Sequence, residues 1–340
     1  MKPVAGCVVG GQRSNGEHRY KPTAGKCAAE VPGPQCAVAF RGGYRGVDSV
    51  QIYFSLFING LAFGCIYGLI ALGFVLIYKA TEMVNFAQGD LLMVGAFIAF
   101  GLIAGLGLNF WLAFALTIVI MFVLGFLLDV VVIRRLIGQP QFSIVMATIG
   151  LGYIFRFVMP YAFNAEQIAF LTPFTGESVG FLGVTLDAGK LATVCGTLVL
   201  CVVLYFFFQR TRVGVAMQAS SQNQLAAYYM GIPVALIFSL IWGISAAVAA
   251  VTGIMMMPIA NVMDPSIGFI AIKAFAGAVV GGFGSIPGAL VGGIIIGLVE
   301  QFSDYLLPAG YKDIMVYSVL LAVMVFRPEG IFSQMGRKKV

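Results

Sequence analysis

The sequence predicts an all-α polytopic membrane protein, a bundle of about eight or nine transmembrane helices in which some helices can be broken. Of its 340 residues 60% are apolar and 10% are charged, and the mean hydropathy is +0.97. A soluble domain is about half apolar and about a quarter charged. Ten of the 34 charged side chains lie in residues 1–50 and five in 327–340, which leaves 19 for the 276 residues between. Soluble enzymes, nucleic-acid-binding modules and disulfide scaffolds are therefore excluded.

Apolar segments with few charges are the candidate spans, because a helix needs about 20 apolar residues to cross a bilayer. The segments are 52–78, 89–107, 110–128, 142–161, 191–208, 234–258, 267–283, 286–300 and 313–326. The Gly- and Pro-containing stretch 281–288 joins either two full spans or two half-helices. The chain therefore crosses the membrane nine or seven times.

The basic residues predict the orientation, since Lys and Arg concentrate in cytoplasmic loops. Alternate connections carry nine of them: Lys79, Arg134, Arg135, Arg210, Arg212, Arg327, Arg337, Lys338 and Lys339. The opposite connections carry Lys190 and Lys312. The short basic tail 333–340 is therefore expected in the cytoplasm, and an odd number of spans places the N-terminus outside.

The first 48 residues do not fit that orientation. They contain seven Lys and Arg, which resist translocation, and they lack the apolar core of a signal peptide. Rich in Gly and Pro, they are expected to be a disordered extension to a membrane domain at 49–332. Either this extension is not native, with the true start near 47–49, or it is native and holds the N-terminus inside.

Small residues recur four positions apart in several spans. Helices in lipid associate through close backbone approach at such positions. The sequence therefore predicts helix packing within the bundle or with a partner chain, and the alternative is that these glycines line a solute path. The glycines are Gly60, Gly64 and Gly68, with Gly277, Gly281, Gly288 and Gly292.

Polar residues within or beside spans are candidates for function, because they are expensive in a membrane. Asn85, Gln88 and Asp90 lie between one span and the next, at an expected membrane face. They either cap the following helix or contact a solute. Arg156 and Lys273 lie inside predicted spans, where they either reach towards a surface or act in function.

The connection 209–233 is long and polar but carries few charges. It contains a helix-compatible stretch, 224–230, with four large apolar or aromatic side chains: Leu225, Tyr228, Tyr229 and Met230. Such side chains in a loop favour docking of a partner by helix-face contact. The alternative is a flap that covers the end of the bundle.

Several motifs are missing from the sequence. It contains no phosphate-binding GxxxxGK[ST] loop, no HExxH and no CxxC pair, and its one histidine, His18, precedes the spans. We therefore predict no catalytic residue, no metal ligand and no cofactor bound by this chain. If transport is energised, the energy comes from another subunit.

The chain resembles the inner-membrane permeases of branched-chain amino acid ABC importers, in particular the shorter of their two permease subunits. The similarity covers about 50–332. It rests on GLAFGCIYGLIALGFVLIY at 60–78, VNFAQGDLLMVGAF at 84–97, RTRVGVAMQA at 210–219, MGIP at 230–233, IGFIAIKAFAGAVVGGFGSIPGALVGGIIIGLVE at 267–300, YKD at 311–313 and RPEGIF at 327–332.

The resemblance implies a second homologous permease, two ATP-binding subunits that hold ATP and Mg²⁺, and a periplasmic binding protein that delivers Leu, Ile or Val. It implies a multi-pass protein of the bacterial inner membrane. A loop helix at 211–232 would enter a cleft on the ATPase; matching or flanking residues are Arg210, Arg212, Gly214, Ala216, Ala219, Leu225, Tyr229, Met230 and Gly231. Val215 and Gln218 stand where the family usually has arginines. The residues of the ATPase that pair with this loop by charge are therefore expected to differ.

Other functions stay open on the sequence alone. Relatives of this family import urea or short amides, and other amino acids are possible substrates. A stand-alone channel for a small neutral solute would not need the exposed residues of 225–230. A secondary transporter would need coupling carboxylates, which are scarce, and an intramembrane enzyme is disfavoured by the missing histidine.

Overall fold

The structure is a computed structural model that describes residues 49–332, apart from 137, 165, 170–171, 177, 182–183, 263 and 309. The expected extension 1–48, with its alternative start sites, and the basic tail 333–340 lie outside the described residues. Seven helices are long and apolar enough to cross a membrane. Two shorter helical segments, Pro265–Gly281 and Tyr311–Phe326, coincide with the remaining two predicted spans.

The prediction of an all-α polytopic membrane protein is confirmed, because each of the nine predicted segments lies in helix. The first elements among the described residues are α2 (Ser49–Thr81), α3 (Gln88–Phe100), η2 (Gly101–Gly105), α4 (Phe110–Leu128), η3 (Asp129–Ile133), α5 (Arg134–Leu136) and α6 (Gln141–Phe163). The others are β1 (Ser178–Phe181), β2 (Val184–Asp187), α7 (Ala188–Arg210), α8 (Arg212–Gln222), α9 (Gln224–Tyr229), α10 (Val234–Ala260), η4 (Pro265–Phe269), α11 (Ile270–Gly281), α12 (Ile286–Leu306) and α13 (Tyr311–Phe326).

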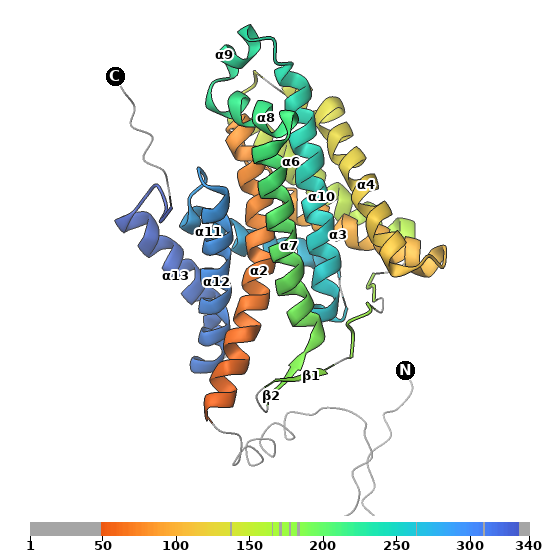
Figure 1. Ribbon diagram of the computed structural model, residues 1–340, viewed down its shortest axis with the longest axis vertical. Helices are drawn as coiled ribbons and strands as arrows, with labels where there is room; N and C mark the ends of the chain where they lie inside the picture. Colours follow the sequence, from red (N-terminus) through yellow and green to blue (C-terminus); the bar gives the residue numbers. More distant parts are fainter. Residues whose placement is uncertain are drawn as a thin grey trace, which may run out of the picture. The chain divides into compact units, whose positions relative to one another are not determined.

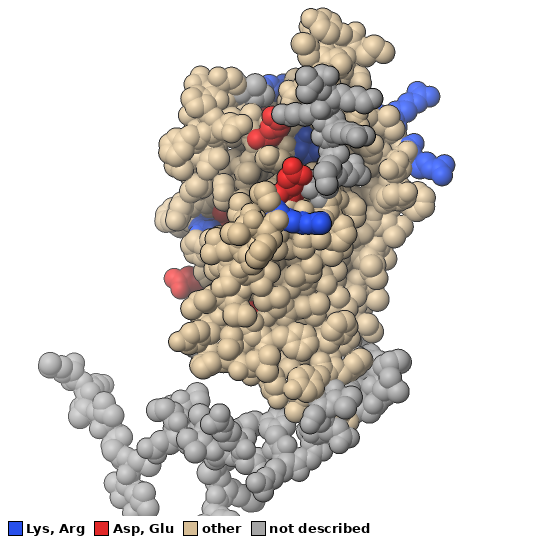
Figure 2. Space-filling model, turned by 90° about the vertical axis from the view of Figure 1, so that its left-hand side faces the viewer, with Lys and Arg blue, Asp and Glu red and all other residues tan. Residues whose placement is uncertain are grey.

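The long helices run side by side, with α8 and α9 at one end of the bundle and the antiparallel pair β1–β2 at the other (Figure 1). Helix α2 is the longest, with 33 residues, and spans about 50 Å. It packs against α10, α11 and α12, so it occupies the centre of the bundle. The face seen in Figure 2 is mostly uncharged, with acidic and basic side chains in a few places.

Glycines set the contact between α2 and α12. A Cβ added at Gly64 would lie 2.7 Å from the Cα of Ile294, and one at Gly68 would lie 3.2 Å from the Cα of Leu290. From the other side, a Cβ on Gly297 would collide with the backbone of Gly64. At Gly64 and Gly297 there is no room for a side chain between these two helices, so the spacing seen in the sequence marks a close backbone contact.

Close backbone contact at glycines also joins α11 to α12. Gly281 and Gly288 face each other so closely that a Cβ on either would collide with the backbone of its neighbour, and Gly277 lies against Gly292 and Gly293. The chain reverses between the two helices at Gly282, which has a φ of 99°. The stretch 281–288 therefore joins a short segment, Pro265–Gly281, to the full-length helix α12.

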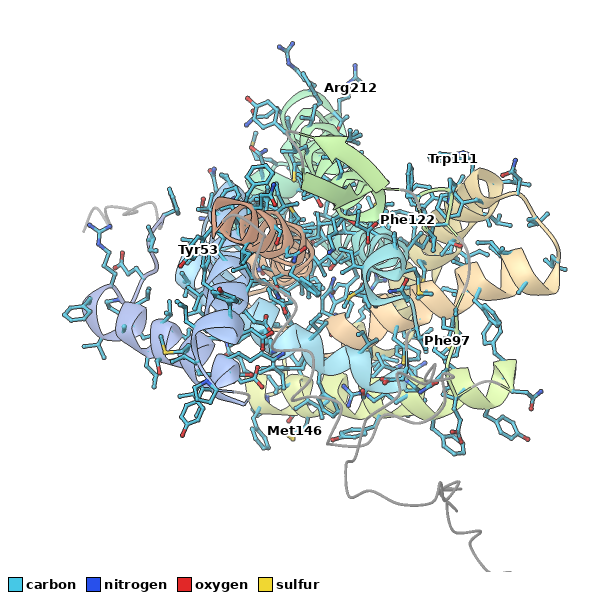
Figure 3. The ribbon with its side chains drawn as sticks, turned by 90° about the horizontal axis from the view of Figure 1, so that it is seen from below. Tyr53, Phe97, Trp111, Phe122, Met146 and Arg212 are labelled. Carbon is cyan, nitrogen blue, oxygen red and sulfur yellow. The ribbon has the colours of Figure 1, made fainter. Side chains whose placement is uncertain are left out.

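Side-chain burial divides the helices into two groups. Large apolar side chains of α2 and α3 are buried, as Phe97 is beside Phe163, with ring centroids 5.8 Å apart. Side chains of α4 and α6 are often exposed, including Trp111 at 60% and Met146 at 45% (Figure 3). Helices with apolar surfaces of this kind face lipid or another protein.

Candidate functional site

The segment before α3 turns back into the bundle. Gln88, the first residue of α3, is fully buried level with the middle of α10, where its amide Nε2 donates to the carbonyl of Ser245 at 3.2 Å. The Ser245 hydroxyl donates to Gln88 Oε1 at 3.0 Å and lies 3.1 Å from the carbonyl of Gly73 in α2. The sequence predicted only that this residue lies at a membrane face; the structure adds that it is buried inside the bundle, where these polar groups satisfy one another.

Asn85 lies in the same buried loop. Its Oδ1 accepts a hydrogen bond from the backbone N–H of Ala87 at 3.0 Å, so it supports the start of α3. Its Nδ2 group is completely buried and has no hydrogen-bond partner among the described residues. A buried amide with free donors is costly, so this group is a candidate for contact with a bound molecule.

Asp90, in the first turn of α3, forms an ion pair with Arg156 in α6, and 2.5 Å separate Oδ1 from Nε. The two side chains are 5% and 18% exposed. The guanidinium lies over the ring of Phe269, 3.9 Å from its centroid. Thus the two charges that the sequence singled out separately, Asp90 and Arg156, are partners.

Glycines on two neighbouring elements make room for the Asp90 carboxylate. A Cβ on Gly152 of α6 would collide with Asp90 Oδ2, and a Cβ on Gly268 of η4 would collide with Asp90 Oδ1. The carboxylate is therefore enclosed by α6 and η4 as well as by its own helix. This enclosure keeps the ion pair in one geometry.

A second cluster of charges joins four helices. Lys273 of α11 lies 2.6 Å from Glu300 of α12 and 2.7 Å from Asp313 of α13, and the Tyr67 hydroxyl of α2 donates to Glu300. Glu300 is 7% exposed and Asp313 is 50% exposed. The sequence left open whether Lys273 reaches a surface or acts in function; here it links a buried carboxylate to an exposed one.

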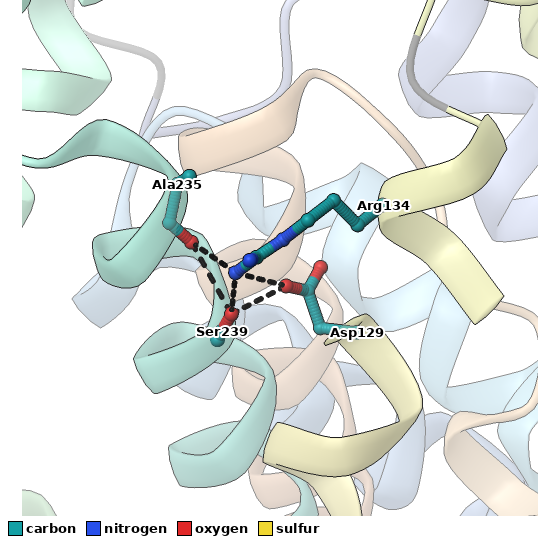
Figure 4. Close-up of polar contacts among 4 residues, drawn as sticks. All are labelled: Asp129, Arg134, Ala235 and Ser239. Carbon is teal, nitrogen blue, oxygen red and sulfur yellow. Dashed lines mark hydrogen bonds and ion pairs between the residues drawn. The ribbon is translucent and has the colours of Figure 1, made fainter. Parts of the chain in front are cut away.

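A third polar cluster joins η3 and α5 to the first turns of α10 (Figure 4). The Ser239 hydroxyl donates to Asp129 Oδ2 at 2.6 Å, and Arg134 Nη2 donates to the Ser239 oxygen at 2.7 Å and to the carbonyl of Ala235 at 3.1 Å. Asp129 is 2% exposed. This cluster fixes the start of α10, directly after the connection that carries α8 and α9.

The connection between α7 and α10 begins at Thr211. The sequence began it at 209, but Gln209 and Arg210 belong to the last turn of α7. Thr211 caps α8 by accepting from the N–H of Gly214 at 3.0 Å, and Asn223 caps α9 by accepting from the N–H of Ala226 at 2.9 Å. We call residues 211–233 the connecting segment.

Three residues, Gly214, Gln218 and Gln224, attach the connecting segment to the bundle. Gly214 packs directly on the backbone of Phe207 and Phe208, and Gln218 donates to the carbonyl of Phe208 at 3.0 Å. Gln224 donates to the carbonyl of Ala80 at the end of α2, at 3.1 Å. Gln218 thus holds α8 against α7. Ala219 is half-buried, and Arg210 and Arg212 are exposed; Arg212 is labelled in Figure 3.

The far end of the connecting segment is an exposed apolar surface. Leu225, Tyr228, Tyr229 and Met230 are 64%, 67%, 78% and 82% exposed, and we call these four residues the α9 knob. Gly231, with a φ of 81°, turns the chain after them. The knob lies at the end of the bundle opposite β1–β2 and projects away from the helices (Figure 1). Exposed apolar and aromatic side chains of this kind are typical of surfaces that dock a partner.

Sequence reasoning missed the partners of these residues rather than the residues themselves. Ser245, Ser239 and Tyr67 gave no signal, since an isolated hydroxyl in a span is common. Asp129 and Arg134 are five residues apart, which is the one local hint of pairing. Among the described residues, no three His, Cys, Asp or Glu side chains are grouped in a way that could hold a metal ion.

The family model described as the permease component of the branched-chain amino acid transport system matches residues 56–324. The chain belongs to this family. Its members are transport permeases, and the seven apolar helices agree with a multi-pass membrane protein. The resemblance inferred from the motifs is thereby confirmed.

Two curated relatives cover most of the chain. The high-affinity branched-chain amino acid transport system permease protein BraD of Pseudomonas aeruginosa is 32% identical, over 86% of this chain and 100% of that protein. The corresponding protein LivH of Escherichia coli K12 is 31% identical, over 83% of this chain and 96% of that protein. The solved structure of PsaBC from Streptococcus pneumoniae in complex with Fab is 17% identical, over 86% of this chain and 97% of that chain, with a TM-score of 0.42.

Proposed function

We propose that this chain is a permease subunit of an ATP-driven ABC importer of the bacterial inner membrane and moves Leu, Ile or Val delivered by a periplasmic binding protein. The observation that carries the proposal is the α9 knob, 64–82% exposed, on a chain of a branched-chain amino acid permease family. A bundle without a phosphate-binding loop in its sequence has to receive energy by contact.

In this proposal, two ATP-binding subunits dock on the connecting segment, at the end of the bundle that is cytoplasmic together with the C-terminus. ATP and Mg²⁺ are held by those subunits. Closure of the ATP sites moves α8 and α9, and α10 follows because it begins directly after the segment. A second homologous permease completes the assembly. A shift between outward and inward states from 1:99 to 99:1 needs about 5.5 kcal/mol of differential binding.

The proposed contact with the amino acid is the start of α3, at Asn85, Gln88 and Asp90. Asn85 supports this role because its Nδ2 donors have no partner in the part of the chain that the structure describes. Gln88 and Asp90 already have partners, so they act by holding the loop in place or by exchanging partners with the solute. Uptake by the Asn85→Ala and Asp90→Ala variants tests this. Wild-type rates in both, at equal expression, would remove these residues from the path.

The main experiment is uptake of radiolabelled leucine by proteoliposomes that hold the chain with its partner subunits, with and without internal ATP. The double variant Tyr229→Ala/Met230→Ala should lose ATP-dependent uptake, because it removes the two most exposed side chains of the knob. Leu306→Ala, at a residue of α12 that is 67% exposed and lies away from the knob, should keep it. ATP-independent uphill accumulation by the chain alone would refute the proposal.

A further inference from the structure

A groove of about 690 Å³ lies beside the connecting segment, between α7, the start of α12 and the central helix α2. Its walls are mostly apolar. They include Leu198, Val202, Tyr205 and Phe206 of α7, Ile286 and Leu290 of α12, and Leu72 of α2. The groove therefore offers a hydrocarbon chain a surface on three sides.

Three polar side chains lie at one end of this groove, namely Lys79, Gln209 and Gln218. Lys79 is in the last turn of α2, and Gln218 belongs to α8. Among the described residues no carboxylate lies within 4.0 Å of the Lys79 ammonium, whereas Lys273 and Lys312 both have acidic partners. The groove is thus apolar along most of its length and has at one end a cation, Lys79, without an acidic partner among the described residues.

The groove opens onto the side of α7 that is most exposed. Val199, Val202, Val203 and Tyr205 are 63%, 54%, 55% and 63% exposed. In a chain with seven apolar spans, a surface of this composition lies in the hydrocarbon of the membrane. A molecule that enters the groove from this side comes from the lipid phase, with its polar end at the level of α8.

We propose that the groove holds one anionic phospholipid, with an acyl chain along α7 and α12 and its phosphate at Lys79. Charge complementarity selects this occupant, because a neutral lipid or an apolar helix would leave the Lys79 charge uncompensated. Exposed arginines at the same end of the bundle, Arg210 and Arg212, add to the positive potential. This inference does not depend on the proposed substrate or on the ATPase.

The lipid would also contact α8, which belongs to the connecting segment that carries the α9 knob. Gln218, which lines the polar end, donates to the carbonyl of Phe208 and holds α8 against α7. A bound lipid therefore adds contacts between α2, α7, α8 and α12. It should stabilise the position of α8 relative to the bundle.

The first test is retention of lipid by the full chain, purified in mild detergent and analysed by native mass spectrometry after incubation with phosphatidylglycerol or phosphatidylcholine. The wild type should retain phosphatidylglycerol over phosphatidylcholine. Lys79→Gln should reduce that retention about fivefold, the effect of one basic side chain near an anionic headgroup. Arg210→Gln, at the same end but outside the groove, should change it less than twofold. Equal retention of both lipids, or an unchanged Lys79→Gln variant, would overturn the proposal.

The second test uses two neighbouring valines of α7 that are equally exposed. Val202 lines the groove and Val203 does not. Val202→Trp fills the groove and should displace phosphatidylglycerol, whereas Val203→Trp should not. A photoreactive phosphatidylglycerol should cross-link to α7 and α12 near Lys79. Equal loss in the two tryptophan variants, or cross-links confined to other helices, would show that the lipid binds elsewhere and that the groove has another occupant.

Discussion

Two apolar regions of the molecule contrast with each other: the contact between helices α2 and α12, and the α9 knob. At the first, glycines bring two backbones together so closely that a single Cβ at Gly297 would collide with Gly64. At the second, three large side chains of a six-residue helix and Met230 directly after it are mostly exposed. Polarity does not distinguish these regions, because both the interior and the exterior of a membrane protein are apolar.

The two regions differ in whether their groups have interaction partners elsewhere in the chain. Many interior groups have partners: glycine faces backbone, Asp90 faces Arg156, and Asp129 faces Ser239. The knob has no such partner within the described residues. Substitutions should therefore lower stability in the interior and leave it unchanged at the knob, where they should affect only function.

The largest loss of stability is expected when the Asp90–Arg156 pair is broken. Arg156→Gln leaves a carboxylate that is 5% exposed without its counter-charge, which should lower the free energy of unfolding by about 3–5 kcal/mol. Equilibrium unfolding in mixed micelles measures this. The double variant Asp90→Asn/Arg156→Gln should lose less than the sum of the single variants. Asp304→Asn, in an exposed pair with Lys312, is the control and should change stability by less than about 1 kcal/mol.

The close contact of α2 with α12 gives the next largest effect. Gly297→Ala should lower the free energy of unfolding by about 3 kcal/mol, because the added Cβ meets the backbone of Gly64 and the helices have to separate. Gly150→Ala is the control: this glycine of α6 has no atom within 4 Å of an added Cβ. It should leave stability unchanged or raise it by up to about 1 kcal/mol, since alanine favours helix. A similar loss in both variants would mean that the loss does not come from the collision.

A smaller effect is expected at the start of α10. Ser239→Ala removes the hydroxyl that donates to Asp129 and accepts from Arg134, and it leaves the buried carboxylate 3.8 Å from Arg134. The free energy of unfolding should fall by about 2 kcal/mol. Ser221→Ala is the comparison, since its hydroxyl bonds only to a carbonyl of its own helix, and it should cost less than about 1 kcal/mol. An equal cost for the two variants would contradict the role assigned to the Asp129 cluster.

The smallest effect on stability is expected at the α9 knob. Tyr229→Ala and Met230→Ala change residues that are 78% and 82% exposed, so the free energy of unfolding of the isolated chain should stay within about 0.5 kcal/mol of the wild type. A loss above about 1 kcal/mol would show that the knob is part of the folded bundle after all. The comparison of the two regions would then fail.

The sequence alone was enough to predict the helices, the glycine faces and the exposed residues of the knob. Each of these depends on local spacing: apolar runs of sufficient length, small residues four apart, and large side chains in a polar connection. Gly60, Gly64 and Gly68 share one face of any helix that contains them, whatever surrounds it. The family followed from motifs in a fixed order, and the match over 56–324 agrees.

The tertiary structure decided which polar groups meet and how deep they lie. Asp90 and Arg156 are 66 positions apart, and Gln88 and Ser245 are 157 positions apart. No spacing rule connects such residues, and several carboxylates and cations were available to each other in the spans. The pairing depends on the path of the loop before α3, which enters the bundle, where Gln88 and Asp90 find partners that they would lack in hydrocarbon.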